Sequence, residues 1–336
     1  MKKNIFLTIL LLALTIMVIG CSRDSALENN DEEGEKEEFS GEINLGSGTQ
    51  SGTYYPLGAA LAKIWDDEVE DVSVSSQATD ASVENMQLMK QGELDMGLTE
   101  TGVLNEAYTG TGSFEDNEYE DVRVLASLYP QVVQIVARQD AGIESFDDFE
   151  GEDFVPGAAG SATKNLADKV LEAYGMSEDD INAQYVGFSD VTDLMKDKQI
   201  AGGHILSGIP TSAVIEILST ANGELIGLDE EEIDLLTEEN PELFEYTLEE
   251  DTYEEQKEDI NTVSAGNVIA VPKDLPDDVV YDLTKAMWEN IDTIKENVPA
   301  TEETKIETAA EELADVPLHP GAEKYYEEEG VLNEEE

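Results

Sequence analysis

From Gly41 onward, short β-branched runs alternate with amphipathic helical patterns, and this alternation restricts the chain to an α/β fold. The expected elements are a strand near Ile43, a helix to Trp65, a strand at 72–76, a helix at 82–91, a strand at 94–99 and a helix to Tyr108. Such alternation predicts mostly parallel sheets with helices on both faces. Ligands bind such sheets at the carboxyl ends of the strands.

Two glycine-rich segments, 46–58 and 157–163, each follow a strand-like run and open a helix. Glycine lets the backbone turn tightly and expose its N–H groups, and the helix behind adds the positive end of its dipole. Neither segment has the Gly-Lys-Ser/Thr of a phosphate loop, and the first lacks dinucleotide spacing. Either segment alone is equally consistent with a plain tight turn. Together they predict two lobes that close on one small anion.

The first 40 residues predict a cellular address. Lys2 and Lys3 precede an uncharged run at 5–19, which is short for a membrane span but typical of a secretory signal. The run ends at the only cysteine, Cys21, in a sequence that resembles the bacterial lipobox. We therefore expect a lipoprotein signal peptide at 1–20 and a lipid anchor on Cys21, which would place the protein outside the cytoplasm on the cell membrane. A buried thiol is the alternative.

Acidic residues greatly outnumber basic residues in this chain. Residues 22–40 carry eight Asp or Glu against two basic residues, so 21–40 should be a solvated acidic tether. The whole chain has 78 acidic and 18 basic residues, a formal charge of −60. This charge argues against nucleic acid as a partner and favours adaptation to saline or alkaline surroundings. A cationic partner is the alternative, but the carboxylates are spread along the chain.

Six groups of residues, in order along the chain, carry a family resemblance. They are 46–58, 82–85, 128–130 with 134–136, 157–163, 208–210, and 317–322 with 325–326. Over residues 41–332 the chain resembles the TAXI family of TRAP-transporter solute-binding proteins. The resemblance implies a two-lobed periplasmic-binding-protein type II fold with the ligand cleft between the lobes. It also implies an organic acid or acidic amino acid ligand, such as glutamate, glutamine or 2-oxoglutarate, and a TRAP membrane partner driven by an ion gradient.

The lobe boundaries follow from two extended stretches. Residues 122–138 form a run too long for one ordinary strand and are interrupted at Pro130, so the chain should cross between lobes there. The β-like run 261–271 should return it. We expect lobe 1 to comprise 41–130 and 263–336, and lobe 2 to comprise 131–262.

The expected ligand-binding residues supply backbone N–H groups, hydroxyls and amides near strand ends or helix starts. They are Gly48, Ser51, Gly52, Thr53, Tyr54, Ser82, Asn85, Tyr129, Gln134, Gly160, Ser161 and Thr163. Arg138 is added because arginine is scarce here and its planar fork binds carboxylates; a structural ion pair is the alternative. Glu100 is added because it could pair with a ligand ammonium; a surface carboxylate is the alternative.

These features predict a binding protein without catalysis or cofactor, acting as a monomer. His204 and His319 are the only histidines and no cysteine accompanies them, so neither a metal site nor a catalytic triad is expected. An enzyme on the same fold would need a nucleophile and base at recognisable spacing, which we do not find. A lipoprotein that senses a ligand for a membrane signalling partner is the other alternative.

Overall fold

The computed structural model describes residues 41–332. The expected signal peptide, Cys21 and the tether lie outside the described residues. Within the described part, no helix is both long and apolar enough to cross a membrane.

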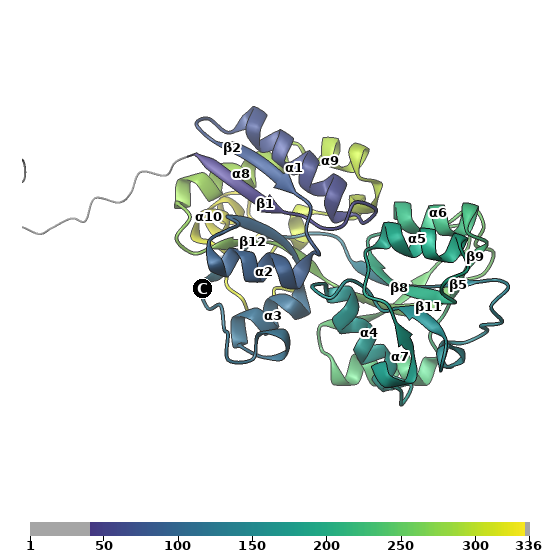
Figure 1. Ribbon diagram of the computed structural model, residues 1–336. Helices are drawn as coiled ribbons and strands as arrows, with labels where there is room; N and C mark the ends of the chain where they lie inside the picture. The colour runs from purple at the N-terminus through teal and green to yellow at the C-terminus, as the bar shows by residue number, and fades with distance from the viewer. Residues whose placement is uncertain (1–40, 333–336) are drawn as a thin grey trace, which may run out of the picture. The chain divides into compact units, whose positions relative to one another are not determined.

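The first sheet has five strands in the order β2-β1-β3-β12-β4. Its strands are β1 (Glu42–Gly46), β2 (Ser73–Gln77), β3 (Met96–Glu100), β4 (Val122–Ser127) and β12 (Asn267–Pro272). The helices α1 (Tyr54–Glu68) and α8 (Asp277–Glu289) lie on one face, and α2 (Ser82–Gln91) and α3 (Thr101–Thr109) lie on the other (Figure 1). Two more helices, α9 (Ile291–Asn297) and α10 (Pro320–Glu328), pack beside α1 and α8 respectively.

The second sheet has seven strands, with β10-β11-β5-β8-β6-β7 in line and β9 paired to β5. They are β5 (Gln131–Arg138), β6 (Asp153–Val155), β7 (Asn182–Ala183), β8 (Gly202–Ser207), β9 (Gly223–Ile226), β10 (Leu243–Leu248) and β11 (Ile260–Ala265). The helices α4 (Ala162–Ala173) and α7 (Glu230–Glu239) cover one face, and α5 (Phe188–Lys196) and α6 (Ser212–Thr220) cover the other (Figure 1). Short 3-10 helices occupy Gly112–Phe114, Phe146–Phe149, Glu178–Asp180, Pro299–Thr301 and Ile306–Thr308.

The chain passes from the first sheet to the second between β4 and β5, and it returns between β11 and β12 at Gly266. The extended run 122–138 is thus two strands in two different sheets. The expected predominance of parallel pairing is wrong. Parallel pairs join β1 to β2 and β3, and β6 to β7 and β8, whereas the other pairs are antiparallel. The strands next to the crossings, β4, β5, β11 and β12, account for the antiparallel pairs.

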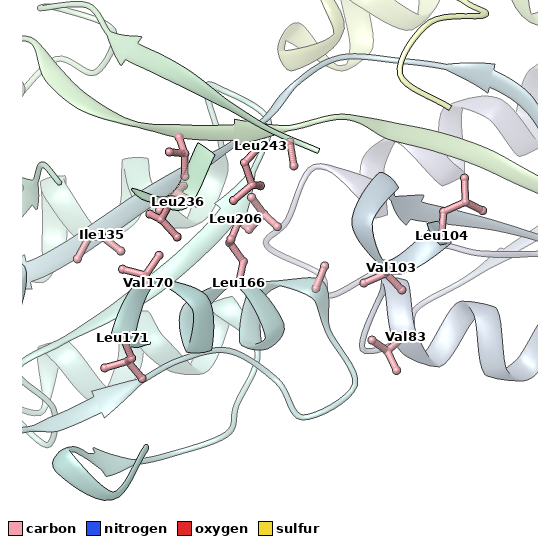
Figure 2. Close-up of a cluster of buried hydrophobic side chains, with 14 of the residues drawn as sticks. Val83, Val103, Leu104, Ile135, Leu166, Val170, Leu171, Leu206, Leu236 and Leu243 are labelled. Carbon is pink, nitrogen blue, oxygen red and sulfur yellow. The ribbon is translucent and has the colours of Figure 1, made fainter. Parts of the chain in front are cut away.

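Apolar spacing along α4 explains how the second sheet is covered. Leu166, Val170 and Leu171 fall on one face of the helix and are buried, together with Leu206 of β8 and Leu236 of α7 (Figure 2). Residues three or four positions apart share a helix face, so this pattern directs α4 onto the sheet. The packing fixes the direction in which the N-terminus of α4 points.

Candidate functional site

A small cavity lies where the N-termini of α1, α2 and α4 meet. Its volume is about 30 Å³, which is room for about two waters. Its lining is made mostly of glycine, hydroxyl and small apolar residues: Gly48, Thr49, Gly52, Thr53, Tyr54, Asp80, Ala81, Ser82, Gln131, Ala158, Ser161, Ala162, Thr163, Gly187, Phe188, Leu206 and Ser207. The cavity therefore draws on segments of both sheets.

The first glycine-rich segment is tied directly to the second sheet. The Thr53 N–H donates to Ser207 Oγ at 3.3 Å, and the Thr53 and Ser207 hydroxyls lie 2.9 Å apart. Thr211 Oγ1 donates to the carbonyl oxygen of Ser51 at 3.3 Å. Thr53 thus lines the cavity, whereas Ser51 supplies a structural acceptor outside it.

The second glycine-rich segment has a backbone that only glycine adopts without strain. Gly157 has φ of +131°, and a Cβ there would lie 2.8 Å from the Lys164 nitrogen. Ser161 is the N-cap of α4: its Oγ accepts from the Lys164 N–H at 3.2 Å and donates to the Ala158 carbonyl. The Gly160 carbonyl accepts from the Glu84 N–H at 3.1 Å, so the second glycine-rich segment contacts the first turn of α2.

The cavity is rich in unused donors. In the part of the chain that the structure describes, the backbone N–H groups of Tyr54, Ser82, Ala162 and Thr163 have no hydrogen-bond acceptor, and all four residues line the cavity. They are the first or second residues of α1, α2 and α4, where a helix leaves its N–H groups free and its dipole is positive. Such an arrangement attracts an anion.

Tyr54 adds a side-chain donor. Its Oη accepts from Gln131 Nε2, a bond that links α1 to the first residue of β5. Burial, followed by the nearby Tyr129 and Glu100, holds the pKa of Tyr54 well above its usual range. The phenol therefore stays neutral at physiological pH, and its hydrogen is available to an acceptor in the cavity.

Glu100 lies beside the cavity but does not line it. Its carboxylate caps α3, accepting from the N–H groups of Gly102 at 2.6 Å and Val103 at 2.9 Å. It faces a separate small space shared with Lys169 and Glu242, which form an ion pair at 2.6 Å. The geometry does not support the expected contact between Glu100 and a ligand ammonium.

Arg138 does not line the cavity, and the geometry does not support the expected carboxylate clamp. Its Nε donates to the Ile200 carbonyl at 2.8 Å and its guanidinium pairs with Asp140. Gln131, which lines the cavity, begins β5, and Arg138 ends it. The two residues are separated by about 20 Å of extended strand. The sequence places Arg138 on the correct strand but at the opposite end.

Three other residues expected to contact a ligand do not line the cavity. Asn85 Nδ2 donates to the carbonyls of Gly46, Ser47 and Leu98, which holds α2 against β1 and β3. Gln134 donates to the Ser207 carbonyl and accepts from the Tyr253 hydroxyl. Tyr129 is buried outside the lining.

The histidines and the described acidic residues form no metal site. His204 is fully buried in β8, and burial lowers its pKa to about 3, so it is neutral. His319 Nδ1 accepts from the Gly321 N–H and caps α10. Among the described residues, no group of three or more His, Cys, Asp or Glu is placed to hold a metal ion.

Sequence reasoning missed part of the cavity: Thr49, Asp80, Ala81, Gln131, Ala158, Ala162, Gly187, Phe188, Leu206 and Ser207. Two of these residues lie next to features that the sequence does show. Gln131 directly follows the crossing at Pro130, and Ser207 directly precedes the Gly208-Ile209-Pro210 turn. Gly187 and Phe188 begin α5 in a segment with no recognisable motif.

Comparison with known proteins places these features in context. The NMT1-like family matches residues 45–330. Among solved structures, PhnD1 from Prochlorococcus marinus in complex with methylphosphonate has a TM-score of 0.55 at 11% identity, covering 87% of this chain and 100% of that one. A protein from Bordetella bronchiseptica has a TM-score of 0.53 at 14% identity, covering 86% and 82%.

The alkanesulfonate-binding protein SsuA from Xanthomonas axonopodis pv. citri, bound to MOPS, is also similar. It has a TM-score of 0.49 at 12% identity, covering 85% of this chain and 83% of that one. The similarity to PhnD1 and to the Bordetella bronchiseptica protein confirms the expected fold class, an α/β fold with two sheets of the type II periplasmic-binding-protein kind. At these identities it establishes the fold alone.

Proposed function

The chain belongs to the NMT1-like family, and we propose that it is an extracytoplasmic solute-binding protein that captures a small organic anion. The observation that carries this proposal is the convergence of four free N–H groups, from Tyr54, Ser82, Ala162 and Thr163, on one cavity. Hydrogen bonds to a charged group contribute about 1.5–3 kcal/mol each. A carboxylate held by several of them needs no basic side chain.

Binding is coupled to closure of two lobes, 41–130 with 263–336 and 131–262. The bonds between Thr53 and Ser207, Tyr54 and Gln131, and Glu84 and Gly160 all join segments of different sheets. A ligand among the helix N-termini adds contacts to both sides, so it favours the closed arrangement. The closed form then presents the surface that a membrane partner recognises.

The finer assignment rests on the family resemblance. The protein is a TAXI-type subunit that delivers an organic acid or amino acid to a TRAP-type secondary transporter, and a lipid on Cys21 holds it at the outer face of the cell membrane as a monomer. A sensor that signals to a membrane protein would use the same binding site. A neighbouring gene with a dozen or more hydrophobic spans would favour the transporter.

Removal of a single N–H group tests the binding site. Ala162 is the first residue of α4, where proline is well tolerated, and Ser161 before it already has the extended backbone that proline requires. Ala162→Pro should leave the melting temperature near that of the wild type. The probe is the ligand that the purified protein releases, identified by mass spectrometry. Ala162→Pro should lower the affinity for this ligand about ten-fold or more.

Ser212→Pro is the matched control, because Ser212 begins α6 after a similarly extended Thr211 and does not line the cavity. Isothermal titration calorimetry should give near-wild-type affinity for this variant. Equal loss of affinity in both variants, or no loss in Ala162→Pro, would overturn the proposed site.

A further inference from the structure

The charges around the cavity restrict its ligand more narrowly than the family does. Within the described chain, no lysine or arginine lines the cavity, and its only charged lining residue is Asp80. Asp80 is exposed in the loop before α2. It lies opposite the second glycine-rich segment, 157–163, because a Cβ at Gly160 would be 3.2 Å from Asp80 Cβ.

The nearest basic residues on α4 are committed elsewhere. Lys164 Nζ lies 2.7 Å from Asp168 and 2.9 Å from Glu178. Lys169 Nζ lies 2.6 Å from Glu242, in the neighbouring space that also contains Glu100. Each ammonium is therefore neutralised by carboxylates, and a second negative charge on a ligand finds no free cation.

The N–H groups compensate one buried carboxylate. The cavity as it stands holds only about two waters, so a ligand enters with the lobes apart. When the lobes close on it, a second carboxylate is removed from water without a partner, which is strongly unfavourable. Repulsion from Asp80 at the rim adds to this cost. A neutral amide of the same shape avoids both effects.

We propose that the pocket selects ligands with a single carboxylate charge and rejects the matching dicarboxylates, with Asp80 as the group that repels the second charge. This inference rests on the proposed function of the same site. Within the ligand class implied by the family resemblance, it favours glutamine over glutamate and excludes 2-oxoglutarate.

Pairs of probes that differ by one charge test the proposal. Glutamine with glutamate, and succinamate with succinate, are nearly isosteric. Calorimetric titration of the purified protein at pH 7.5 and fixed salt should show about ten-fold or more tighter binding of the amide in at least one pair. Dicarboxylates that bind as tightly as their amides would overturn the selectivity but leave the binding function intact. Failure of every probe, and of any released ligand, to bind would overturn both.

Asp80→Asn tests the assigned residue. It should raise the affinity for succinate several-fold while leaving succinamate within about two-fold, because this pair carries no ammonium and only the second carboxylate meets Asp80. Asp66→Asn is the control: it makes the same charge change on α1, outside the cavity lining. If Asp80→Asn leaves the amide-to-acid ratio unchanged, or Asp66→Asn changes it equally, Asp80 is not the discriminating group.

Discussion

Replacing Glu100 by glutamine removes a carboxylate that the fold buries at the N-terminus of α3, so its effect on stability depends on pH. Burial is the largest influence and raises the pKa of Glu100 from 4.5 to about 7, against the opposing hydrogen bonds from Gly102 and Val103. Lys169 opposes the rise and Glu242 adds to it. The folded state thus holds this proton more tightly than the unfolded state.

The sign and size of the effect follow from proton linkage. Between pH 4.5 and about 7 the folded protein binds more protons at this site, so the free energy of unfolding falls as pH rises. Each pH unit in this window lowers the free energy of unfolding by up to about 1.4 kcal/mol. From pH 5 to 7.5 the wild type should lose about 2 kcal/mol that Glu100→Gln does not lose.

Urea unfolding at pH 5 and 7.5, in the same high-salt buffer, measures this difference directly. Glutamine keeps one acceptor oxygen for the cap, so the variant should fold, and the comparison uses only its change with pH. Glu42→Gln, at the exposed first residue of β1, is the control for general charge effects. A stability gap between wild type and Glu100→Gln that is identical at both pH values would refute the reasoning.

Two further predictions follow from the ion pairs and the net charge. Arg138→Ala should lower the free energy of unfolding by about 1–3 kcal/mol, because it leaves the Ile200 carbonyl without its donor and leaves Asp140 with only one of its two cations, Lys198. Titration should show unchanged ligand affinity; a large loss of affinity would support the clamp. Raising NaCl from tens of millimolar to molar should raise the midpoint of thermal unfolding, because salt screens the repulsion within a chain of charge −60. A midpoint that does not change with salt in thermal scans would contradict saline adaptation.

The two glycine-rich segments could be predicted from the sequence because the residues that determine their structure are close together in the chain. Glycines, a capping serine and a helical apolar stripe lie within a few residues of each other, and they place Gly48, Gly52, Thr53, Ser161 and Thr163 at the cavity. The same reasoning expected hydroxyl and backbone donors, and residues that carry such groups line the cavity. These groups lie at the cavity because a strand ends and a helix begins at each of the two segments.

The missed and misplaced residues depend on non-local geometry. Arg138 and Gln131 share β5, and only the direction in which the strand enters the second sheet decides which end meets the cavity. Ser207 reaches Thr53 through the pairing of β8 with β5. The mixed pairing of the sheets likewise follows from crossings whose partners are far apart in sequence.

In so acidic a chain, the choice of helix N-termini is itself informative. Basic side chains are captured by neighbouring carboxylates, as Lys164 is by Asp168 and Glu178. Helix N-termini are open to the same competition: Glu100 caps α3, and three glutamates occupy the first turn of α7. Of the three helices whose N-termini meet at the cavity, α2 has Glu84 in its first turn, whereas the first turns of α1 and α4 contain no acidic residue, so the positive ends of α1 and α4 stay unneutralised. In a chain with 78 acidic residues, leaving the N-termini of α1 and α4 without an acid is what allows a ligand carboxylate to compete for them.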